Sequence, residues 1–189
     1  MKKLVSLMIL VVLVSATVTG QRSRSLPRSV VPSPLLYTPG WVNISDVTYG
    51  FGLGETHTTT NPDKSFFSFT SGLSYQINRN WTTGGGTGLM FNQDKFFVPL
   101  FLTGRYNFSM PGGHVLPYLN ADAGVLFNFE DFNNETRLFV NPMAGVRYVI
   151  TSYVSATGGL GVLTHMGPNS VRNSFFTVRL GVFISLNKK

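Results

Sequence analysis

The sequence predicts an all-β protein: an eight-stranded, antiparallel, up-and-down β-barrel that crosses a membrane with its strands. Three observations lead to this fold class. Only 12% of the residues are charged while 43% are hydrophobic, and that charged share is about half the share usual for soluble domains. From Ile44 onward, apolar and polar residues alternate in runs of about eleven residues, and the links between the runs alternate in length.

The first twenty residues have the pattern of a secretory signal peptide. A basic start is followed by the apolar run Leu4–Val14 and then by small residues ending at Gly20. We expect cleavage after Gly20, with cleavage after Ala16 as the second choice. A membrane anchor is the less favoured alternative, because the apolar run is well short of the ~20 residues that a spanning helix needs.

Residues 21–43 are rich in arginine, serine and proline, and four prolines lie between Pro27 and Pro39. Proline at this density opposes both helix and ladder hydrogen bonding. The sequence therefore predicts an extended lead-in over 21–43 and a barrel domain over 44–187.

Eight runs of alternating residues follow, and most are longer than the strands of soluble sheets. Soluble strands average about 5–6 residues, whereas strands that cross a bilayer obliquely need about 9–11. The predicted strands are 46–55, 66–77, 81–91, 97–108, 116–128, 137–149, 153–163 and 175–186.

The connections alternate between tight turns and longer polar links. Residues 78–80 and 151–152 are tight, whereas 56–65, 130–136 and 164–174 are longer. Short periplasmic turns that alternate with longer outer loops are typical of bacterial outer-membrane barrels. An even strand number then places both ends of the chain on the periplasmic side.

Alternation also assigns the two faces of each strand. In the last predicted strand, Leu180 points to one face whereas Arg179 and Gly181 point to the other, and we expect the apolar face to contact lipid. The opposite face is rich in glycine, which leaves room for large interior side chains in a narrow eight-stranded barrel. Twelve of the 20 glycines have this interior parity: Gly50, Gly52, Gly54, Gly72, Gly84, Gly86, Gly88, Gly124, Gly145, Gly159, Gly161 and Gly181.

Aromatic residues gather near both ends of the predicted strands, which suggests two girdles at the membrane interfaces. Beside the short turns lie Tyr75, Trp81, Tyr106, Tyr118, Tyr148 and Tyr153. Beside the longer loops lie Phe66, Phe67, Phe91, Phe96, Phe97, Phe127, Phe129, Phe175 and Phe176.

The segments VPLFLTGRYNF (98–108), LPYLNADAGVLF (116–127) and GVRYVITSYVSATGGLGV (145–162) resemble the outer-membrane protein β-barrel domain family. This family includes small OmpA- and OmpX-like barrels and many Bacteroidetes proteins. The resemblance extends over 44–186 and rests on alternation, so it implies fold rather than a specific role. It implies a bacterial outer-membrane location and, as partners, outer-membrane lipids and the barrel-assembly machinery. The terminal aromatic residue common in proteobacterial members is absent, since the chain ends in Asn187-Lys188-Lys189.

The formal net charge of +7 does not indicate a nucleic-acid partner, because the excess lies outside the predicted barrel. Between Ile44 and Leu186 there are eight basic and eight acidic residues. The chain has no cysteine, which excludes disulfides, thiolate metal sites and cysteine nucleophiles.

Two patterns that carry chemistry in other proteins are weak here. Gly84–Gly88 is rich in glycine but lacks the Lys-Ser/Thr pair and the helix of a phosphate loop. His57, His114 and His165 fall at predicted loops or turns without the spacing of metal ligands. We expect no metal site and no cofactor.

A Ser-His-acid set near the outer rim deserves testing, because some small barrels are enzymes that modify lipid A. His165 and Ser170 with Glu130 or Glu135 are the candidates. No local nucleophile signature supports them, so solvated loop residues are the preferred interpretation and no enzymatic activity is expected.

Four charged residues have interior parity: Arg105, Asp122, Arg147 and Arg179. Turn centres estimated from the sequence place Arg105, on the preceding strand, opposite Asp122. They also place Arg147, on the following strand, opposite Asp122. Because an unpaired buried charge is costly, a bridged Arg–Asp–Arg network is expected. A structural plug is the favoured interpretation, and a gate for small ions is the alternative.

Three functional hypotheses remain at this point. The first is a monomeric barrel with a side-chain-filled interior and a structural or interaction role at the cell surface. The second is a narrow ion or small-solute channel gated by the interior Arg–Asp network. The third, least favoured, is a lipid-modifying enzyme.

Overall fold

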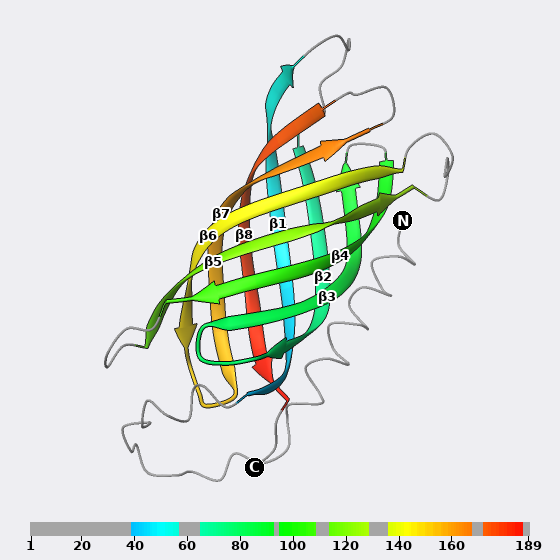
Figure 1. The fold of residues 1–189 in the computed structure, drawn as a ribbon. Coiled ribbons are helices and arrows are strands. Elements are labelled where there is room, and N and C mark those ends of the chain that lie inside the picture. The colour runs from blue at the N-terminus through cyan, green and yellow to red at the C-terminus, as the bar shows by residue number, and fades with distance from the viewer. Residues whose placement is uncertain are drawn as a thin grey trace, which may run out of the picture. The chain divides into compact units, whose positions relative to one another are not determined.

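The computed structural model describes residues 39–56, 65–92, 95–108, 114–128, 136–167 and 172–186. Each strand pairs antiparallel with its neighbours in sequence, and the first strand pairs with the last, so that the sheet closes into a barrel (Figure 1). The predicted fold class is confirmed. The strands are β1 (Gly40–Thr56), β2 (Ser65–Gln76), β3 (Trp81–Asn92), β4 (Lys95–Asn107), β5 (Val115–Phe127), β6 (Arg137–Val149), β7 (Val154–Met166) and β8 (Arg172–Ser185).

The bounds of β2 to β8 lie within three residues of the predicted ones, whereas β1 begins six residues earlier than expected. The barrel therefore starts at Gly40, inside the segment assigned to the lead-in. The early part of β1 reverses the usual alternation, because Val42 and Ile44 are buried inside while Asn43 and Ser45 point outward. A search for outward apolar residues misses such a strand. The predicted signal peptide lies outside the described residues.

Two tight turns close one end of the barrel, which we call the turn end. Asn78 Oδ1 accepts hydrogen bonds from the backbone N–H groups of Asn80 (2.9 Å) and Trp81 (2.8 Å). Thr151 Oγ1 does the same for the backbone N–H groups two and three residues later. Such side-chain acceptors hold the chain in a turn. Both turns were predicted at these positions.

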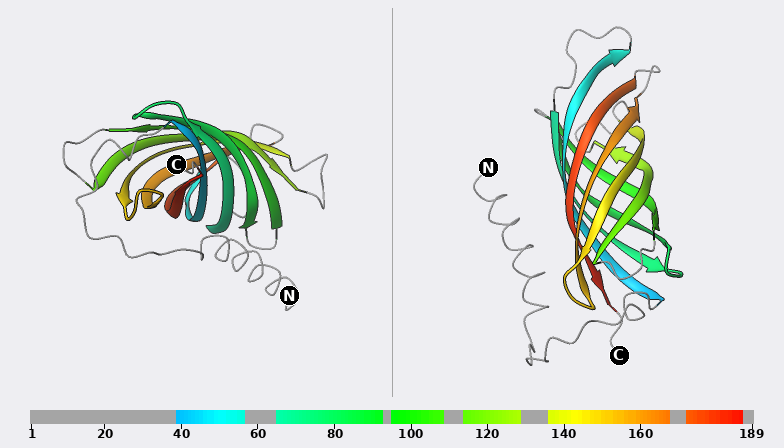
Figure 2. Two further views of the ribbon diagram at one scale, coloured as in Figure 1. Left: turned by 90° about the horizontal axis from the view of Figure 1, so that it is seen from below. Right: turned by 90° about the vertical axis from the view of Figure 1, so that its left-hand side faces the viewer.

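The two ends of the barrel sequence meet at this same end, because the backbone N–H of Leu186 donates to the carbonyl of Trp41 (2.9 Å). The strands slant across the barrel wall, as the side view in Figure 2 shows. We call the opposite end the loop end. Among the described residues, no helix is long and apolar enough to cross a membrane.

The outward face of the barrel is apolar and the inward face carries most of the polar residues, as predicted. Leu102 is 74% exposed and Leu180 is 66% exposed, which is expected of side chains that contact lipid rather than a protein core. Asp122, Arg105, Arg147 and Arg179 are all buried.

The interior glycines make room for large neighbours. A Cβ at Gly50 would meet the Phe66 ring, and one at Gly145 would meet the Tyr118 ring. This agrees with the prediction of a filled interior. Gly52 keeps the predicted interior parity, since it lies opposite the buried Phe175, although it is exposed near the end of β1.

The girdle prediction is correct for some aromatic residues and wrong for others. Trp41 and Tyr75 lie edge-to-face on the outside at the turn end (5.3 Å between ring centroids), and so do Trp81 and Tyr106 (5.1 Å). Tyr118, however, is buried inside the barrel.

Three of the loop-end phenylalanines assigned to the girdle are also inside: Phe66, Phe97 and Phe175. The correction has a simple cause: nearness to a strand end sets the depth of a residue, but only its parity sets the face. Phe129 lies outside the described residues.

Candidate functional site

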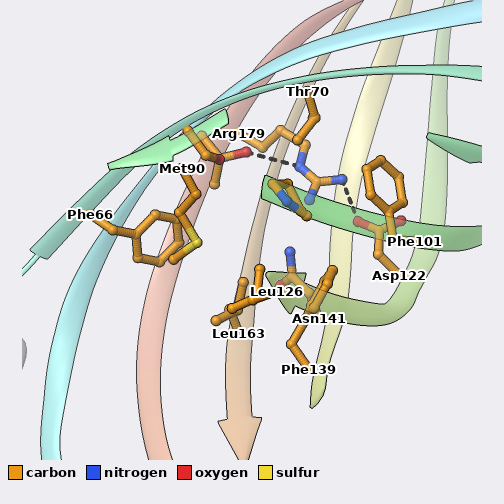
Figure 3. A pocket seen from close by; sticks show the side chains of 13 residues that line it. Phe66, Thr70, Met90, Phe101, Asp122, Leu126, Phe139, Asn141, Leu163 and Arg179 are labelled. Atoms are coloured by element: carbon orange, nitrogen blue, oxygen red, sulfur yellow. Dashed lines mark hydrogen bonds and ion pairs between the residues drawn. The ribbon is translucent and has the colours of Figure 1, made fainter. Parts of the chain in front are cut away.

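A charged cluster formed by Asp46, Asp122 and Arg179 lies inside the barrel. Arg179 Nη1 is 2.7 Å from Asp122 Oδ2 and 3.7 Å from Asp46 Oδ2. Arg179 Nε also donates to Thr48 Oγ1 (3.2 Å). Figure 3 shows the guanidinium group of Arg179 reaching toward Asp122. All three charged side chains are buried, so one cation is shared between two anions out of contact with bulk water.

Strand register brings these groups together. Arg179 of β8 lies opposite Thr48 of β1, and Asp46 lies opposite Gly181, whose missing side chain leaves space for the Asp46 carboxylate. Asp122 of β5 accepts hydrogen bonds at Oδ1 from Thr103 Oγ1 and Asn120 Nδ2, both at 2.7 Å. A buried ion pair is stable only when its remaining lone pairs find such partners.

The structure does not place Arg105 or Arg147 opposite Asp122. Asp122 lies opposite Thr103 on β4 and opposite Asn141 on β6. The expected Arg–Asp–Arg arrangement is therefore wrong in register. The register of a hairpin is set by turn geometry, and centres estimated from turn-forming residues can miss by several positions.

Arg105 and Arg147 pack against aromatic rings instead. The Arg105 guanidinium carbon lies 4.3 Å from the centroid of Tyr118, and its Nε donates to Asn120 Oδ1 (3.2 Å). The Arg147 guanidinium carbon lies 3.6 Å from the centroid of Phe183, and its Nε donates to Ser155 Oγ (3.0 Å). Cation–π contacts of this kind stabilise a buried cation.

Sequence reasoning missed Asp46 because it placed this residue at the first position of its strand. The signal was present, since Asp46 shares the parity of Thr48 and Gly50. With Asp46 included, the charged cluster has two carboxylates, whereas the sequence prediction gave it only Asp122.

An apolar cluster fills the barrel interior toward the loop end. Its rings and aliphatic groups come from seven strands, β2 to β8, and Phe66 and Phe175 meet edge-to-face (5.1 Å). The buried members are Phe66, Met90, Phe97, Leu126, Phe139, Leu163 and Phe175.

A cavity of about 30 Å³ lies where the apolar cluster meets the charged cluster. Phe66, Leu126 and Leu163 line it from one cluster, and Asp122 and Arg179 from the other (Figure 3). The two clusters are thus stacked in the interior with only a small space between them.

His165 lies inside β7 and not in a loop as predicted. Its ring is buried and stacks on Phe175 (5.3 Å, 25° between planes), with Arg137 Nη1 3.5 Å from Nδ1. The other members of the suggested Ser-His-acid set, Ser170, Glu130 and Glu135, lie outside the described residues, and so does His57. His114 is exposed just before β5. Across the described ranges, no group of three or more His, Asp or Glu side chains is placed to hold a metal ion.

No family model matches the chain, and no curated protein matches its sequence. Among solved structures, the barrel is similar to Neisserial surface protein A, with a TM-score of 0.60 and 16% identity over 78% of this chain and 97% of that chain. It is similar to the outer membrane protein OprG from Pseudomonas aeruginosa, with a TM-score of 0.52 and 8% identity over 80% of this chain and 98% of that chain.

The N-terminal β-barrel domain of OprF from Pseudomonas aeruginosa is a third similar structure, with a TM-score of 0.51 and 14% identity over 78% of this chain and 100% of that domain. At these identities the likeness shows the fold: this chain has the fold of small outer-membrane barrels.

Proposed function

We propose that this protein is a bacterial outer-membrane barrel with a closed interior and a structural or interaction role at the cell surface. The observation that carries the proposal is the pair of stacked clusters. The buried Asp46–Arg179–Asp122 set and the apolar cluster occupy adjoining levels of the interior, and the apolar cluster lies toward the loop end. A barrel whose interior is filled in this way can support its outer loops, and it offers solutes no path across the membrane.

Conductance across a planar bilayer tests the closed interior. The purified, refolded protein should give no stable current steps under an applied voltage, because the two clusters interrupt any continuous water path through the barrel. Steady ohmic current from the parent protein would instead favour a channel.

The same proposal includes location, orientation and assembly. We place the turn end at the periplasm, with both termini on that side, and expect a monomer that contacts outer-membrane lipids and is inserted by the barrel-assembly machinery. The tight turns and the Leu186–Trp41 contact at one end support this orientation. We also propose that the chain belongs to the outer-membrane protein β-barrel domain family and to its Bacteroidetes type. The alternation patterns of the strands support this assignment.

Cysteine labelling on whole cells tests the orientation. A cysteine placed within 57–63 or 166–173 should react with a membrane-impermeant reagent, whereas Asn80→Cys should not. Reaction at position 80 together with protection at position 61 would invert the topology.

A narrow ion channel is the second candidate, and one observation favours it. Arg179 is shared unequally between two carboxylates, at 2.7 and 3.7 Å, with cavities of about 30 and 10 Å³ beside them. Such an arrangement allows the guanidinium group to change partner. If Arg179 is a gate, Arg179→Gln should raise the conductance of a parent protein that already conducts; a closed barrel should stay silent.

We further propose that the protein is not an enzyme. The burial of His165 under Phe175 supports this, because a general base must reach its substrate. Mass spectrometry of lipid A and phospholipids incubated with the refolded protein should show no modified species, and turnover of either lipid would overturn this part of the proposal.

A further inference from the structure

A second cavity, of about 10 Å³, lies beside the charged cluster on the side nearer the turn end. It is lined by both charged partners of Arg179 and by Arg105, which the direct contacts of the charged cluster leave out. Its polar lining residues are Asp46, Ser74, Thr103, Arg105, Asp122 and Arg179.

Four of these residues carry a buried polar atom without a hydrogen-bond partner among the described residues: Asp46 Oδ1, Ser74 Oγ, Arg105 Nη1 and Asp122 Oδ2. Of these atoms, Asp122 Oδ2 is held by its ion pair with Arg179. Ser74 is 0% exposed and Arg105 is 2% exposed, so bulk solvent does not reach these side chains. Buried polar groups in native proteins nearly always have a partner, and an ordered water supplies it where protein atoms do not.

The lining of the cavity selects the chemical class of its occupant. Two guanidinium groups and two carboxylates surround it, so their charges cancel and neither a cation nor an anion gains from the site. A cavity needs roughly 10–15 Å³ on this measure to hold one water, which leaves no room for a hydrated ion. The occupant must also accept from an arginine and donate to a carboxylate, and water does both.

We propose that this cavity binds one ordered water molecule that connects Arg105 to Asp46 and Ser74. The water accepts a hydrogen bond from Arg105 Nη1 and donates to the Asp46 carboxylate and the Ser74 hydroxyl, which gives the three hydrogen bonds typical of a buried water. Arg105 thereby joins the Asp46–Arg179–Asp122 set through water instead of through direct contact. The site does not depend on whether the barrel conducts.

A crystal structure of the unmodified protein at better than ~2 Å tests the site directly. We expect an electron-density peak about 2.7–3.2 Å from Arg105 Nη1 and from an oxygen of Asp46 or Ser74. No peak there, in a map that shows other interior waters, overturns the proposal. An anomalous peak at this position after a bromide soak overturns it in favour of an anion site.

A double-mutant cycle provides a test in the membrane. Urea unfolding midpoints in lipid vesicles are measured for Arg105→Met, Asp46→Asn and the double variant. A bridged pair should give a shift for the double variant smaller than the sum of the single shifts. Repeating the cycle in a Ser74→Ala background should reduce this coupling at least twofold, because the water loses one of its three partners.

The matched control is Arg147→Met, since Arg147 packs on Phe183 and does not line the cavity. Its shift should add to that of Asp46→Asn. Additive shifts for Arg105 and Asp46, or a coupling that Ser74→Ala leaves unchanged, contradict a water bridge.

Discussion

The charged cluster and the apolar cluster fill the same barrel by different physical means. In the charged cluster, Arg179 is held by an ion pair with Asp122, by a longer one with Asp46 and by a hydrogen bond to Thr48. In the apolar cluster, rings such as Phe66 and Phe175 hold one another by contact. The stability of a paired network depends on the presence of every partner, whereas the stability of apolar packing depends on the volume of the side chains. The two regions should therefore respond differently to similar substitutions.

The largest effect is expected where one partner of the charged cluster is removed. Asp122→Ala leaves Arg179 without its nearer carboxylate in a narrow, poorly hydrated space, which typically costs ~3–5 kcal/mol. Urea unfolding in lipid vesicles measures this loss. Stability equal to that of the parent would mean that Asp122 is solvated and that Arg179 gains nothing from it.

A somewhat smaller effect separates the interior from the outer surface. Leu180 is the next residue to Arg179 but points outward, so Leu180→Arg places a charge in lipid and should destabilise the barrel by ~2–4 kcal/mol near the midplane. Leu180→Val is the control and should change stability little. If Leu180→Arg refolds into vesicles as stably as the control, the assignment of faces is wrong.

Substitutions that preserve shape sharpen the comparison between the two clusters. Asp122→Asn keeps the size of the side chain but removes its charge, and we expect a loss of ~1.5–3 kcal/mol, the usual range for a hydrogen bond to a charged group. Met90→Leu keeps the volume of the apolar cluster and should cost less than ~1.5 kcal/mol. Both are measured by the same unfolding assay. A larger loss of stability for Met90→Leu than for Asp122→Asn would contradict this difference between the two clusters.

The sequence predicts the strands and their faces well because alternation is a local property. Leu180 and Arg179 can be assigned to opposite faces without knowing any partner strand. The failure at β1 has the same origin, since Val42 and Ile44 inside and Asn43 and Ser45 outside reverse the rule.

Pairing between strands was much harder to predict than the strands themselves. All four predicted interior charges are buried, yet the partner of Asp122 is Arg179, from a strand far along the chain, instead of Arg105 or Arg147. This pairing depends on hairpin register and barrel closure together, and neither is encoded in one short segment. Asp46 was missed because a six-residue error in the start of β1 moved it to a strand end.

The central proposal is that the charged cluster and the apolar cluster each close the interior of the barrel. Single-channel recording tests it most directly. Asp122→Ala and Phe175→Ala should each remain silent in a planar bilayer, because each leaves the other cluster in place. The double variant, verified as folded by its resistance to unfolding in vesicles, should show current steps. Steady conduction by the parent, or silence of the folded double variant, would contradict the account.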